Sequence, residues 1–524
     1  MIKLTLVLFL FSCSQFVQMT DDQYFEQINS KGADHVSIIF SHNINGETHP
    51  CGCRKFPLGG LPQINGVIKH QQSLAPTLYV DTGDTFFETT IVPKEIKESS
   101  SYKANEIAKA MDLLDLKLFT PGDQDFALGE DFLVKLSQKH HFKFLISNSS
   151  QMMRIKHQKL VRIDADGVSL FFIGVLEPSL LKSQYRNLFT SPKMAIKNQI
   201  ETINKQFSHL KNKRIILLSH SGMKFDESVA QSFPSINWII GAHTQSYLTE
   251  ANEVNQTKIV QVLSRNHHLG QIKLGLSAKA KNSYQLIEIK DHTKDLIKNN
   301  KFVPWLNTYK SNLDKIHLSE QNMSAPANEG QKLPTYISCS DCHTKQVEFW
   351  QSTAHSLALL TLKKDNSLHN PQCIKCHSLG FKEKGGFSKT DKYIHTSDKN
   401  FTLKSYWDDF NKTIKVPKSV RKLSPKQRKT ISQKWLQLDT NKTVLANHGN
   451  VQCLNCHNQN AEHPFGDEVR LSSKNYQTKC LNCHTTNQSP AWYNKDTKGI
   501  ATTVNEKYFS KKLKEVSCPK IENK

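Results

Sequence analysis

The sequence Cys-x-x-Cys-His occurs four times between residues 339 and 484 of this 524-residue chain. Two thiols at this spacing can add to the two vinyl groups of one porphyrin, and the adjacent imidazole can then bind the iron. The pattern therefore predicts four covalently attached haems of the c type. The predicted attachment residues are Cys339, Cys342, Cys373, Cys376, Cys453, Cys456, Cys480 and Cys483. The predicted proximal iron ligands are His343, His377, His457 and His484.

Two other kinds of site use paired cysteines. C-x-x-C pairs build zinc ribbons, and the cysteines of exported proteins form disulfides. Neither requires a histidine directly after every second cysteine, whereas all four copies have one. Haem attachment explains these histidines, and we favour it over both alternatives.

Carboxylates and imidazoles form a second set of candidate ligands, in the first half of the chain. They occur in four short segments that each follow an apolar run typical of a β-strand: 81–84 (DTGD), 122–126 (GDQDF), 219–222 (SHSG) and 241–244 (GAHT). Side chains placed directly after neighbouring strands can converge on one metal ion. These segments therefore predict a metal site at one edge of a sheet.

A third group combines His49 with Cys51 and Cys53. With His49, the two thiols could serve as soft metal ligands. Alternatively, they could form a strained C-x-C disulfide with redox activity, or a structural pair without chemistry. The sequence leaves these three readings open.

Strands and helices alternate over residues 34–290, which predicts an α/β domain. The expected strands are 36–40, 77–80, 116–119, 142–146, 168–175, 214–218 and 238–240, and the expected helices include 102–114 and 192–207. The later apolar runs, 258–263, 271–276 and 284–289, have no helix between them. They predict an antiparallel edge.

The rest of the chain has a different composition. Residues 291–335 are expected to form a polar helical segment followed by a linker, because 319–334 (SEQNMSAPANEGQKLP) is rich in small and turn-forming residues. Residues 336–490 hold the Cys-x-x-Cys-His copies and lack strand patterns. We expect a mostly α-helical or irregular haem domain there, and a basic tail over 491–524.

The segment CSDCHTKQVEFWQSTAHSLAL and the later CIKCHSLGF and VQCLNCHNQNAEHP resemble multihaem c-type cytochromes that shuttle electrons in bacterial respiration. The resemblance covers about residues 336–487. It implies that His355 and His463 are distal iron ligands, and His448 is a further candidate. Bis-histidine ligation would predict electron transfer, whereas an iron with an open position would suggest catalysis on a small molecule.

The order of the strand-end segments resembles the calcineurin-like metallophosphoesterases, and within them the secreted 5′-nucleotidases. That family binds two metals and opens with Asp-x-His, which here is Asn43-Ile-Asn45. Its Gly-Asn-His-Glu appears as Gly122-Asp-Gln-Asp125, so the catalytic His is Gln124. Its final Gly-x-His-x-His appears as Gly241-Ala-His-Thr-Gln245.

The missing ligands all belong to one of the two metals that the family binds. The ligand set that the resemblance implies for the other is intact and consists of Asp84, Asp123, His220 and His243. We therefore expect at most one divalent ion, with Mn, Zn and Fe as the candidates. Hydrolysis by two metals requires both ions to clamp the attacking and leaving oxygens, so ordinary phosphoesterase activity is not expected.

The first twelve residues have the features of a signal peptide: Lys3 is followed by a short apolar run that cannot span a bilayer. The ending Leu-Phe-Ser-Cys13 resembles a bacterial lipobox, which implies cleavage before Cys13 and lipidation of its sulfur. An ordinary signal peptide is the alternative. We expect an exported protein of the periplasm or outer membrane, held to the membrane by its lipid anchor.

The net charge is +22, and the lysines are scattered without a nucleic-acid motif. We therefore expect redox partner proteins and a lipid anchor, but no nucleic acid. The expected function is electron transfer by four haems joined to a phosphoesterase-like domain with a reduced metal site. A haem-coupled redox enzyme, a nucleotidase-like hydrolase and a non-catalytic binding module are alternatives, and a small-molecule substrate is left open.

Overall fold

The computed structural model describes residues 22–50, 57–277, 280–322, 333–415, 419–457, 472–486, 488–495 and 501–519. The chain divides into two compact units. The sandwich unit runs to Glu47 and continues over Val67–Ile91 and Ala108–Ile289, and the helical unit contains Thr48–Gly66, Val92–Ile107 and the chain from Lys290 onward.

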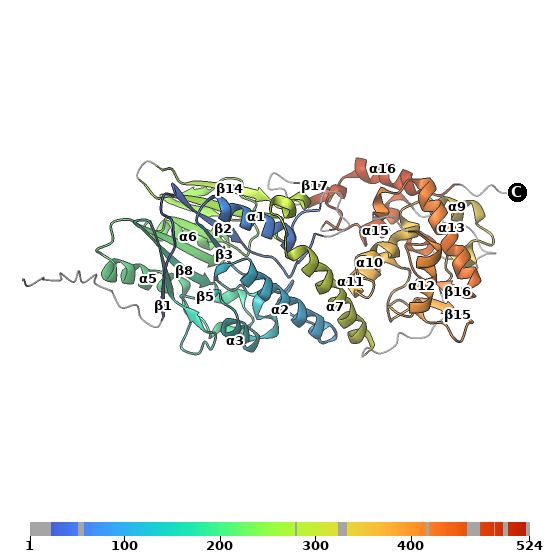
Figure 1. Cartoon of the computed structure of the whole chain (residues 1–524), viewed down its shortest axis with the longest axis horizontal. Helices are drawn as coiled ribbons and strands as arrows, with labels where there is room; N and C mark the ends of the chain where they lie inside the picture. Colours follow the sequence, from blue (N-terminus) through green and yellow to red (C-terminus); the bar gives the residue numbers. More distant parts are fainter. Residues whose placement is uncertain are drawn as a thin grey trace, which may run out of the picture. The chain divides into compact units, whose positions relative to one another are not determined.

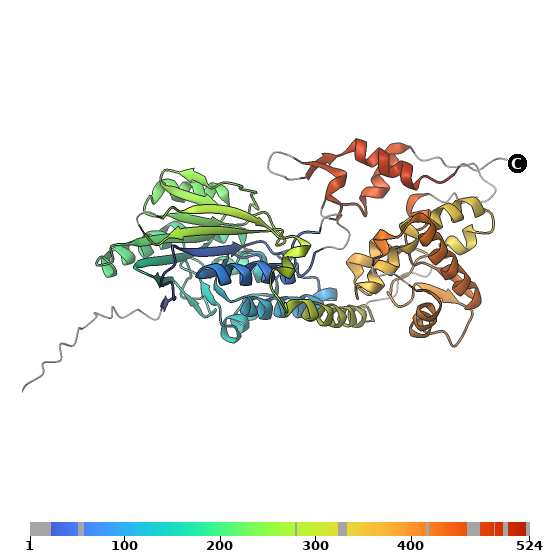
Figure 2. The ribbon, with the colours of Figure 1, turned by 45° about the horizontal axis from the view of Figure 1, so that its top comes forward.

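The sandwich unit contains two sheets of seven strands each (Figures 1 and 2). In spatial order, the first sheet consists of β1 (Gln23–Gln27), β7 (Leu160–Ala165), β8 (Val168–Leu176), β9 (Lys213–His220), β10 (Trp238–Gly241), β12 (Thr257–Val260) and β11 (Asn252–Val254). The second consists of β14 (Ser283–Glu288), β13 (His268–Gly275), β2 (His35–Ser41), β3 (Thr77–Asp81), β4 (Leu116–Phe119), β5 (Lys143–Leu145) and β6 (His157–Gln158).

The central strands are parallel in both sheets. β2, β3, β4, β5 and β6 pair in parallel in the second sheet, and β8, β9, β10 and β12 do so in the first. Parallel strands are covered on both faces, which explains why all nine residues of β8 are buried. The apolar core contains side chains of both sheets, including Phe40 of β2 and Phe172 of β8.

The expected antiparallel edge is correct for two of its three strands. β13 pairs antiparallel with β2 and β14. The third expected strand, β12, lies in the first sheet, where it pairs in parallel with β10 and antiparallel with β11. The crossover from β10 to β12 contains β11 rather than a helix, so the absence of a helical pattern did not show the parallel pairing.

Helices cover the sheets, and short 3₁₀ turns lie in the connections between strands and helices. They are α1 (Leu61–Leu74), α2 (Lys97–Leu113), α3 (Glu130–Lys139), α4 (Ser183–Arg186), α5 (Pro192–Gln206) and α6 (Met223–Ser232). The turns are η1 (Lys94–Ile96), η2 (Gln124–Leu128) and η3 (Pro178–Leu180). Ile196 and Ile203 of α5 and Val229 of α6 bury their side chains against the outer face of the first sheet. This arrangement confirms the α/β sandwich predicted from the sequence.

The helical unit is dominated by short helices and the long α7, drawn in olive in Figure 1. Its helices are α7 (Phe302–Asn322), α8 (Tyr336–Cys339), α9 (Thr344–Gln351), α10 (Ala358–Lys364), α11 (Pro371–His377), α12 (Leu403–Thr413), α13 (Pro425–Asn441), α14 (Cys453–Cys456), α15 (Ser473–Leu481) and α16 (Glu506–Val516). Its 3₁₀ turns are η4 (Asp291–Leu296), η5 (His355–Leu357), η6 (Val420–Lys422) and η7 (Pro490–Trp492). The mostly helical fold expected here is confirmed, and α7 continues to Asn322, past the start of the expected linker.

Four short strands in this unit were not expected from the sequence. β15 (Ile394–Thr396) pairs with β16 (Val444–Asn447), and β17 (Tyr493–Lys495) pairs with β18 (Ala501–Val504). Each has only three or four residues, too few to produce a recognisable alternation of apolar and polar residues. The second pair and α16 lie in the segment expected as a basic tail, seen in red in Figure 2.

A search of the described residues finds no helix with both the length and the apolar character needed to cross a membrane.

Candidate functional site

The structure brings together the four strand-end residues predicted as metal ligands. Asp84 follows β3, Asp123 follows β4, His220 ends β9 and His243 follows β10. One ligand atom from each lies within 4.8 Å of the other three, and three of the four residues are buried. Each sheet contributes two of the residues from the carboxyl ends of parallel strands, where α/β folds place their sites.

Close approach of two loops explains the glycines in these segments. A Cβ on Gly83 would lie 2.2 Å from the backbone nitrogen of Gly122, and one on Gly122 would lie 2.3 Å from Asp84 Oδ1 and 2.5 Å from His220 Cε1. Asp84 and His243 have φ angles of 55° and 69°. Such left-handed backbone at non-glycine residues is concentrated at functional sites, where surrounding contacts maintain it.

Asp125 holds the Asp84 loop in place, a role that the sequence did not reveal. Its carboxylate accepts backbone N–H groups of Asp84, Thr85, Phe86 and Gly122 at 2.8–3.0 Å. Burial, together with the nearby Asp84 carboxylate, raises the pKa of Asp125 to about 7. The signal was present in the sequence as the second carboxylate of the segment 122–126.

The tautomer of His220 suits a ligand. Its Nδ1 donates to the carbonyl oxygen of Thr82 at 2.6 Å, so Nε2 is the atom that faces Asp84 Oδ2 at 3.4 Å and Asp123 Oδ1 at 3.3 Å. Burial would lower the pKa of His220, but the two carboxylates outweigh it and hold the pKa well above the usual value. His243 Nδ1 lies 3.2 Å from the same oxygen of Asp123. The cluster therefore favours a cation, and these donors fit one divalent metal.

Asn43 occupies the first position of the lost Asp-x-His segment, and its orientation follows from its neighbours. The N–H of Val262 donates to His42 Nε2, so His42 Nδ1 carries the proton and donates to Asn43 Oδ1 at 2.8 Å. The N–H of His243 donates to the same oxygen. The Asn43 amide nitrogen therefore donates to Asp84 Oδ2 at 3.0 Å. A hydrogen-bond donor thus contacts Asp84 at the position where the family pattern has an aspartate.

The other substituted positions also carry carboxamides: Asn45, Gln124 and Gln245. The backbone N–H groups of Asn45 and Gln124 donate to the main-chain oxygen and to Oδ1 of Asp84, respectively. Among the described residues, Asn45 Oδ1 and Gln124 Oε1 are buried without a hydrogen-bond partner. A neutral amide cannot replace the imidazole that would protonate a leaving group.

The third predicted group is only partly described. His49 belongs to the helical unit, where its Nδ1 lies 2.9 Å from Thr48 Oγ1 and burial lowers its pKa well below the usual value. Cys51 and Cys53 lie outside the described residues, as do Cys13 and His463.

Each Cys-x-x-Cys-His copy is wound into a helical turn. The histidine N–H donates to the first cysteine's carbonyl at 2.9 Å in the first copy, 2.7 Å in the third and 2.9 Å in the fourth, and α11 contains the second copy entirely. Residues three and four apart share one face of a helix. Both thiols and the imidazole can therefore reach one porphyrin.

Three pairs of copies lie close to one another. Cys376 lies close to Cys483, Cys339 lies close to Cys453, and α14 of the third copy contacts α15 of the fourth. The first attachment site therefore lies beside the third, the third beside the fourth, and the fourth beside the second. In the part of the chain that the structure describes, these cysteines form no disulfide, and the one cluster of potential metal ligands contains no cysteine. The zinc-ribbon alternative gains no support.

The Nδ1 atoms of two motif histidines have identified partners. His377 Nδ1 donates to the carbonyl of Ala358 at 2.7 Å, and His484 Nδ1 lies 2.9 Å from Ser489 Oγ. Burial, with His355 and His377 nearby, lowers the pKa of His484 to about 4, so this imidazole is neutral and able to bind iron. These residues fit a haem iron.

The distal candidates differ in their surroundings. The His355 ring lies 6.5 Å from that of His484, so a non-motif imidazole faces a motif imidazole. His448 is fully buried, and its ring lies 5.4 Å from that of His395, a second non-motif histidine. The structure therefore associates His355 with the fourth copy, whereas its place in the sequence is next to the first.

Comparisons with known proteins match the two parts of the chain separately. The family model for cytochrome c554 and c-prime matches residues 338–399, which include the first two Cys-x-x-Cys-His copies. An uncharacterized metallophosphoesterase, YunD, of Bacillus subtilis is 24% identical over 220 residues, covering 39% of this chain and 44% of that protein. The 5′-nucleotidase of Mus musculus is 21% identical over 253 residues, covering 42% of each chain.

Among solved structures, the 5′-nucleotidase precursor from Thermus thermophilus is similar with a TM-score of 0.45 and 14% identity, covering 63% of this chain and 66% of that one. The chain spans less than half the length of these two curated relatives. The chain thus has a metallophosphoesterase/5′-nucleotidase-like domain, and its helical region includes a segment that matches the cytochrome c554 family model.

Proposed function

We propose that this chain is an envelope electron-transfer protein with four covalent c-type haems and a phosphoesterase-like domain that holds one divalent ion. The observation that carries this proposal is the repeated helical turn of the Cys-x-x-Cys-His copies, which places two thiols and one imidazole on a common face. A haem would supply a one-electron centre whose iron is held by axial ligands. The residues of this chain would attach the porphyrin and orient the imidazole, and burial keeps His484 unprotonated.

The number of haems follows from the number of copies. The cytochrome family match covers two of them, and the third and fourth have the same His-to-Cys backbone hydrogen bond as the first. The first copy lies close to the third, the third contacts the fourth, and the fourth lies close to the second, which supports a continuous series of attachment sites. Such proximity favours rapid electron exchange along the series.

We infer that the sandwich unit binds a single divalent metal and does not act as an ordinary phosphoesterase. Asp84, Asp123, His220 and His243 would hold the ion, whose two positive charges balance the two carboxylates. A bound ion would supply Lewis acidity or a redox centre. The amide of Asn43 contacts Asp84 on the side of the missing ligands, so no carboxylate–imidazole set remains for a second ion.

A count of metals and haems on the purified mature protein tests this proposal. We expect about four haems per chain by the pyridine haemochrome assay and about one further divalent ion by elemental analysis. The Asp84→Ala variant should lose the extra ion and keep all four haems, whereas a Cys480→Ser/Cys483→Ser variant should lose one haem and keep the ion. Two or fewer haems would refute the cytochrome assignment, and two extra ions would refute the single-metal site.

A haem-coupled redox enzyme is the second candidate, favoured by the donor set of two imidazoles and two carboxylates, which suits iron and manganese. Its substrate would change the oxidation state of the haems. Anaerobic mixing of the reduced protein with candidate oxyanions, followed by haem absorbance, tests it. Haem oxidation that is lost in Asp84→Ala but retained in Lys404→Ala would favour the enzyme, and equal rates in both would favour simple electron transfer.

The proposed location is the periplasm or outer membrane of a bacterium, with a lipid on Cys13. The signal-peptide pattern and lipobox-like ending support this. Mass spectrometry of the mature N-terminus should give a diacylglyceryl-modified Cys13, and Cys13→Ser should move the protein from the membrane fraction to the soluble periplasm. A mature chain that lacks Cys13, or in which Cys13 carries no lipid, would contradict the anchor.

A further inference from the structure

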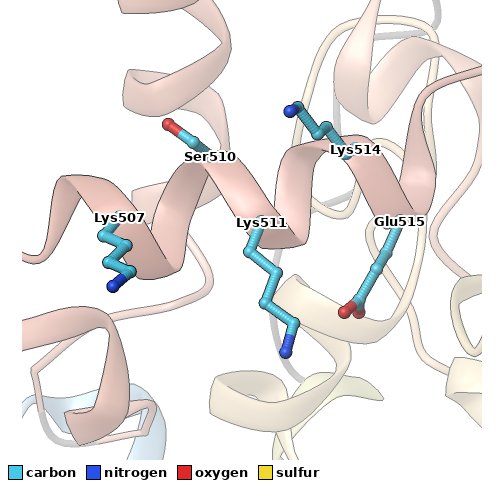
Figure 3. A pocket seen from close by; sticks show the side chains of 5 residues that line it. All are labelled: Lys507, Ser510, Lys511, Lys514 and Glu515. Carbon is cyan, nitrogen blue, oxygen red and sulfur yellow. The ribbon is translucent and has the colours of Figure 1, made fainter.

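The helix α16 carries positive charge on its outer face and aromatic contacts on its inner face. Lys507, Lys511 and Lys514 are exposed and follow a spacing of four and three residues, which places them on one side of the helix. None of the three has an ion-pair partner among the described residues. Figure 3 shows them projecting from α16, with Ser510 and Glu515 beside them.

An open space of about 540 Å³ lies over this side of α16 and is lined by residues of this helix alone. The only carboxylate lining it is Glu515, which is paired with Lys512 at 2.5 Å. The lining therefore keeps a surplus of positive charge at neutral pH. We call the surface of Lys507, Ser510, Lys511 and Lys514 the α16 lysine face.

The inner side of α16 reaches a predicted haem ligand through one aromatic residue. Phe509 is 2% exposed, and its ring lies 6.0 Å from that of Trp492. Trp492 stacks on the imidazole of His484, with ring centroids 4.1 Å apart and an angle of 10° between the planes. The hydroxyl of Tyr493 donates to the His484 carbonyl at 2.8 Å, which fixes this segment to the fourth copy.

We propose that the α16 lysine face is the docking surface for an acidic one-electron carrier protein, which exchanges electrons with the haem at His484. This inference rests on the proposed electron-transfer function. Complementary charge selects and steers the partner, and the short contact path from the helix to His484 places the docked carrier near that attachment site.

A protein partner fits this surface better than a membrane. A helix that inserts into a lipid interface exposes large apolar residues beside its lysines. On α16 the large apolar Phe509 is buried, and the outer face presents lysine, serine and glutamate.

The test uses the full chain with its haems and oxidised plastocyanin, an acidic copper protein, as the probe. Each reaction moves one electron from the reduced protein to Cu(II). The charge-reversal variant Lys507→Glu/Lys511→Glu/Lys514→Glu is compared with Lys193→Glu/Lys197→Glu/Lys205→Glu, three exposed lysines of α5 changed by the same total charge. The triple Lys→Gln variant at 507, 511 and 514 provides a milder change.

The α16 charge reversal should slow the second-order reaction about tenfold or more at low ionic strength, and the difference should vanish in high salt. The Lys→Gln variant should give an intermediate rate, and the α5 control should stay within about twofold of the parent. Equilibrium binding of plastocyanin, measured by interferometry, should weaken in the same order. The uncharged acceptor benzoquinone should oxidise all variants at one rate.

Equal plastocyanin rates and affinities in the two charge-reversal variants would overturn the proposal. Loss of binding to phosphatidylglycerol vesicles, with plastocyanin rates unchanged, would overturn it in favour of a membrane surface. A haem count of two or fewer in the parent protein would count against the electron-transfer function itself, and is measured separately by the pyridine haemochrome assay.

Discussion

Replacing Asn43 with aspartate should destabilise the sandwich unit unless a second metal binds. The amide nitrogen of Asn43 lies 3.0 Å from Asp84 Oδ2, and the other amide atom accepts from His42 and His243. In Asn43→Asp the donor becomes a carboxylate oxygen at the same distance. Two unit charges 3 Å apart repel by about 5 kcal/mol at an effective dielectric constant of about 20.

The pH dependence of the loss follows from this repulsion. The shared site raises the folded-state pKa of the new carboxyl pair above the unfolded value of about 4, by about three to four units for a repulsion of about 4–5 kcal/mol. A carboxyl group whose pKa is raised by folding does not reduce the free energy of unfolding at pH values below its unfolded-state pKa. The free energy of unfolding then falls as the pH rises through the folded-state pKa. We expect a loss of about 3–5 kcal/mol at pH 7.5 in EDTA, falling to about 1 kcal/mol at pH 4.5.

The assay is urea unfolding followed by the fluorescence of Trp238. This residue is 2% exposed in the core between the sheets, and the other five tryptophans belong to the helical unit, where haems would quench them. Asn43→Ala is the matched control, since it loses one hydrogen bond without adding charge and should cost about 1–3 kcal/mol at every pH. MnCl₂ should restore Asn43→Asp by about 3 kcal/mol at a hundredfold excess over its Kd.

The reasoning would be refuted if Asn43→Asp were as stable as the parent in EDTA at pH 7.5, or if its loss equalled that of Asn43→Ala at every pH. An absent response to Mn²⁺ would refute the narrower statement that Asn43 stands where a second ion was once held.

Three further outcomes are expected. Asp125→Asn should lower the stability of the sandwich unit by about 2–4 kcal/mol and reduce the content of the non-haem ion, because an amide group would face backbone donors now bound by a carboxylate. Urea unfolding measures the stability and elemental analysis measures the ion. An unchanged ion content would contradict the positioning role of Asp125. His355→Ala should leave four haems and convert one from low to high spin in the electron paramagnetic resonance spectrum, whereas His369→Ala, whose Nδ1 bonds to Thr390 Oγ1, should not. Burial raises the pKa of Asp439 to about 6, so its ionisation should remove about 3 kcal/mol from the helical unit as the pH rises from 4 through 6, and Asp439→Asn should flatten that dependence in thermal unfolding; identical pH profiles would contradict it.

The sandwich could be predicted because its strands are long apolar runs with ligands at their carboxyl ends. β8 is buried along its whole length, so its sequence is nearly continuous in apolar residues. Asp84, Asp123, His220 and His243 were found for the same reason: each directly follows such a run. The direction of β12 could not be found, because parallel and antiparallel partners bury the same side chains.

The contacts of the Cys-x-x-Cys-His copies could not be predicted from their spacing. The short helices that carry them depend on tertiary contacts, such as Tyr336 and Tyr406 donating to the buried carboxylate of Asp439. Neither the pairing of Cys376 with Cys483 nor the approach of His355 to His484 is a local property. The stacking of Trp492 on His484 likewise joins residues whose separation shows no periodic pattern.

The substitutions at the candidate metal site of the sandwich unit move a negative charge from one position to another and change the total charge less. Relative to the family pattern that the sequence resembles, Asn43 replaces an aspartate and Asp123 replaces an asparagine. A carboxylate is lost on the side of the missing metal and gained on the side that keeps four ligands. Asp84 and Asp123 together offer two negative charges, which one divalent ion neutralises, while the Asn43 amide satisfies the remaining lone pair of Asp84. Under the single-ion proposal, every carboxylate of this set would then face either the ion or a hydrogen-bond donor.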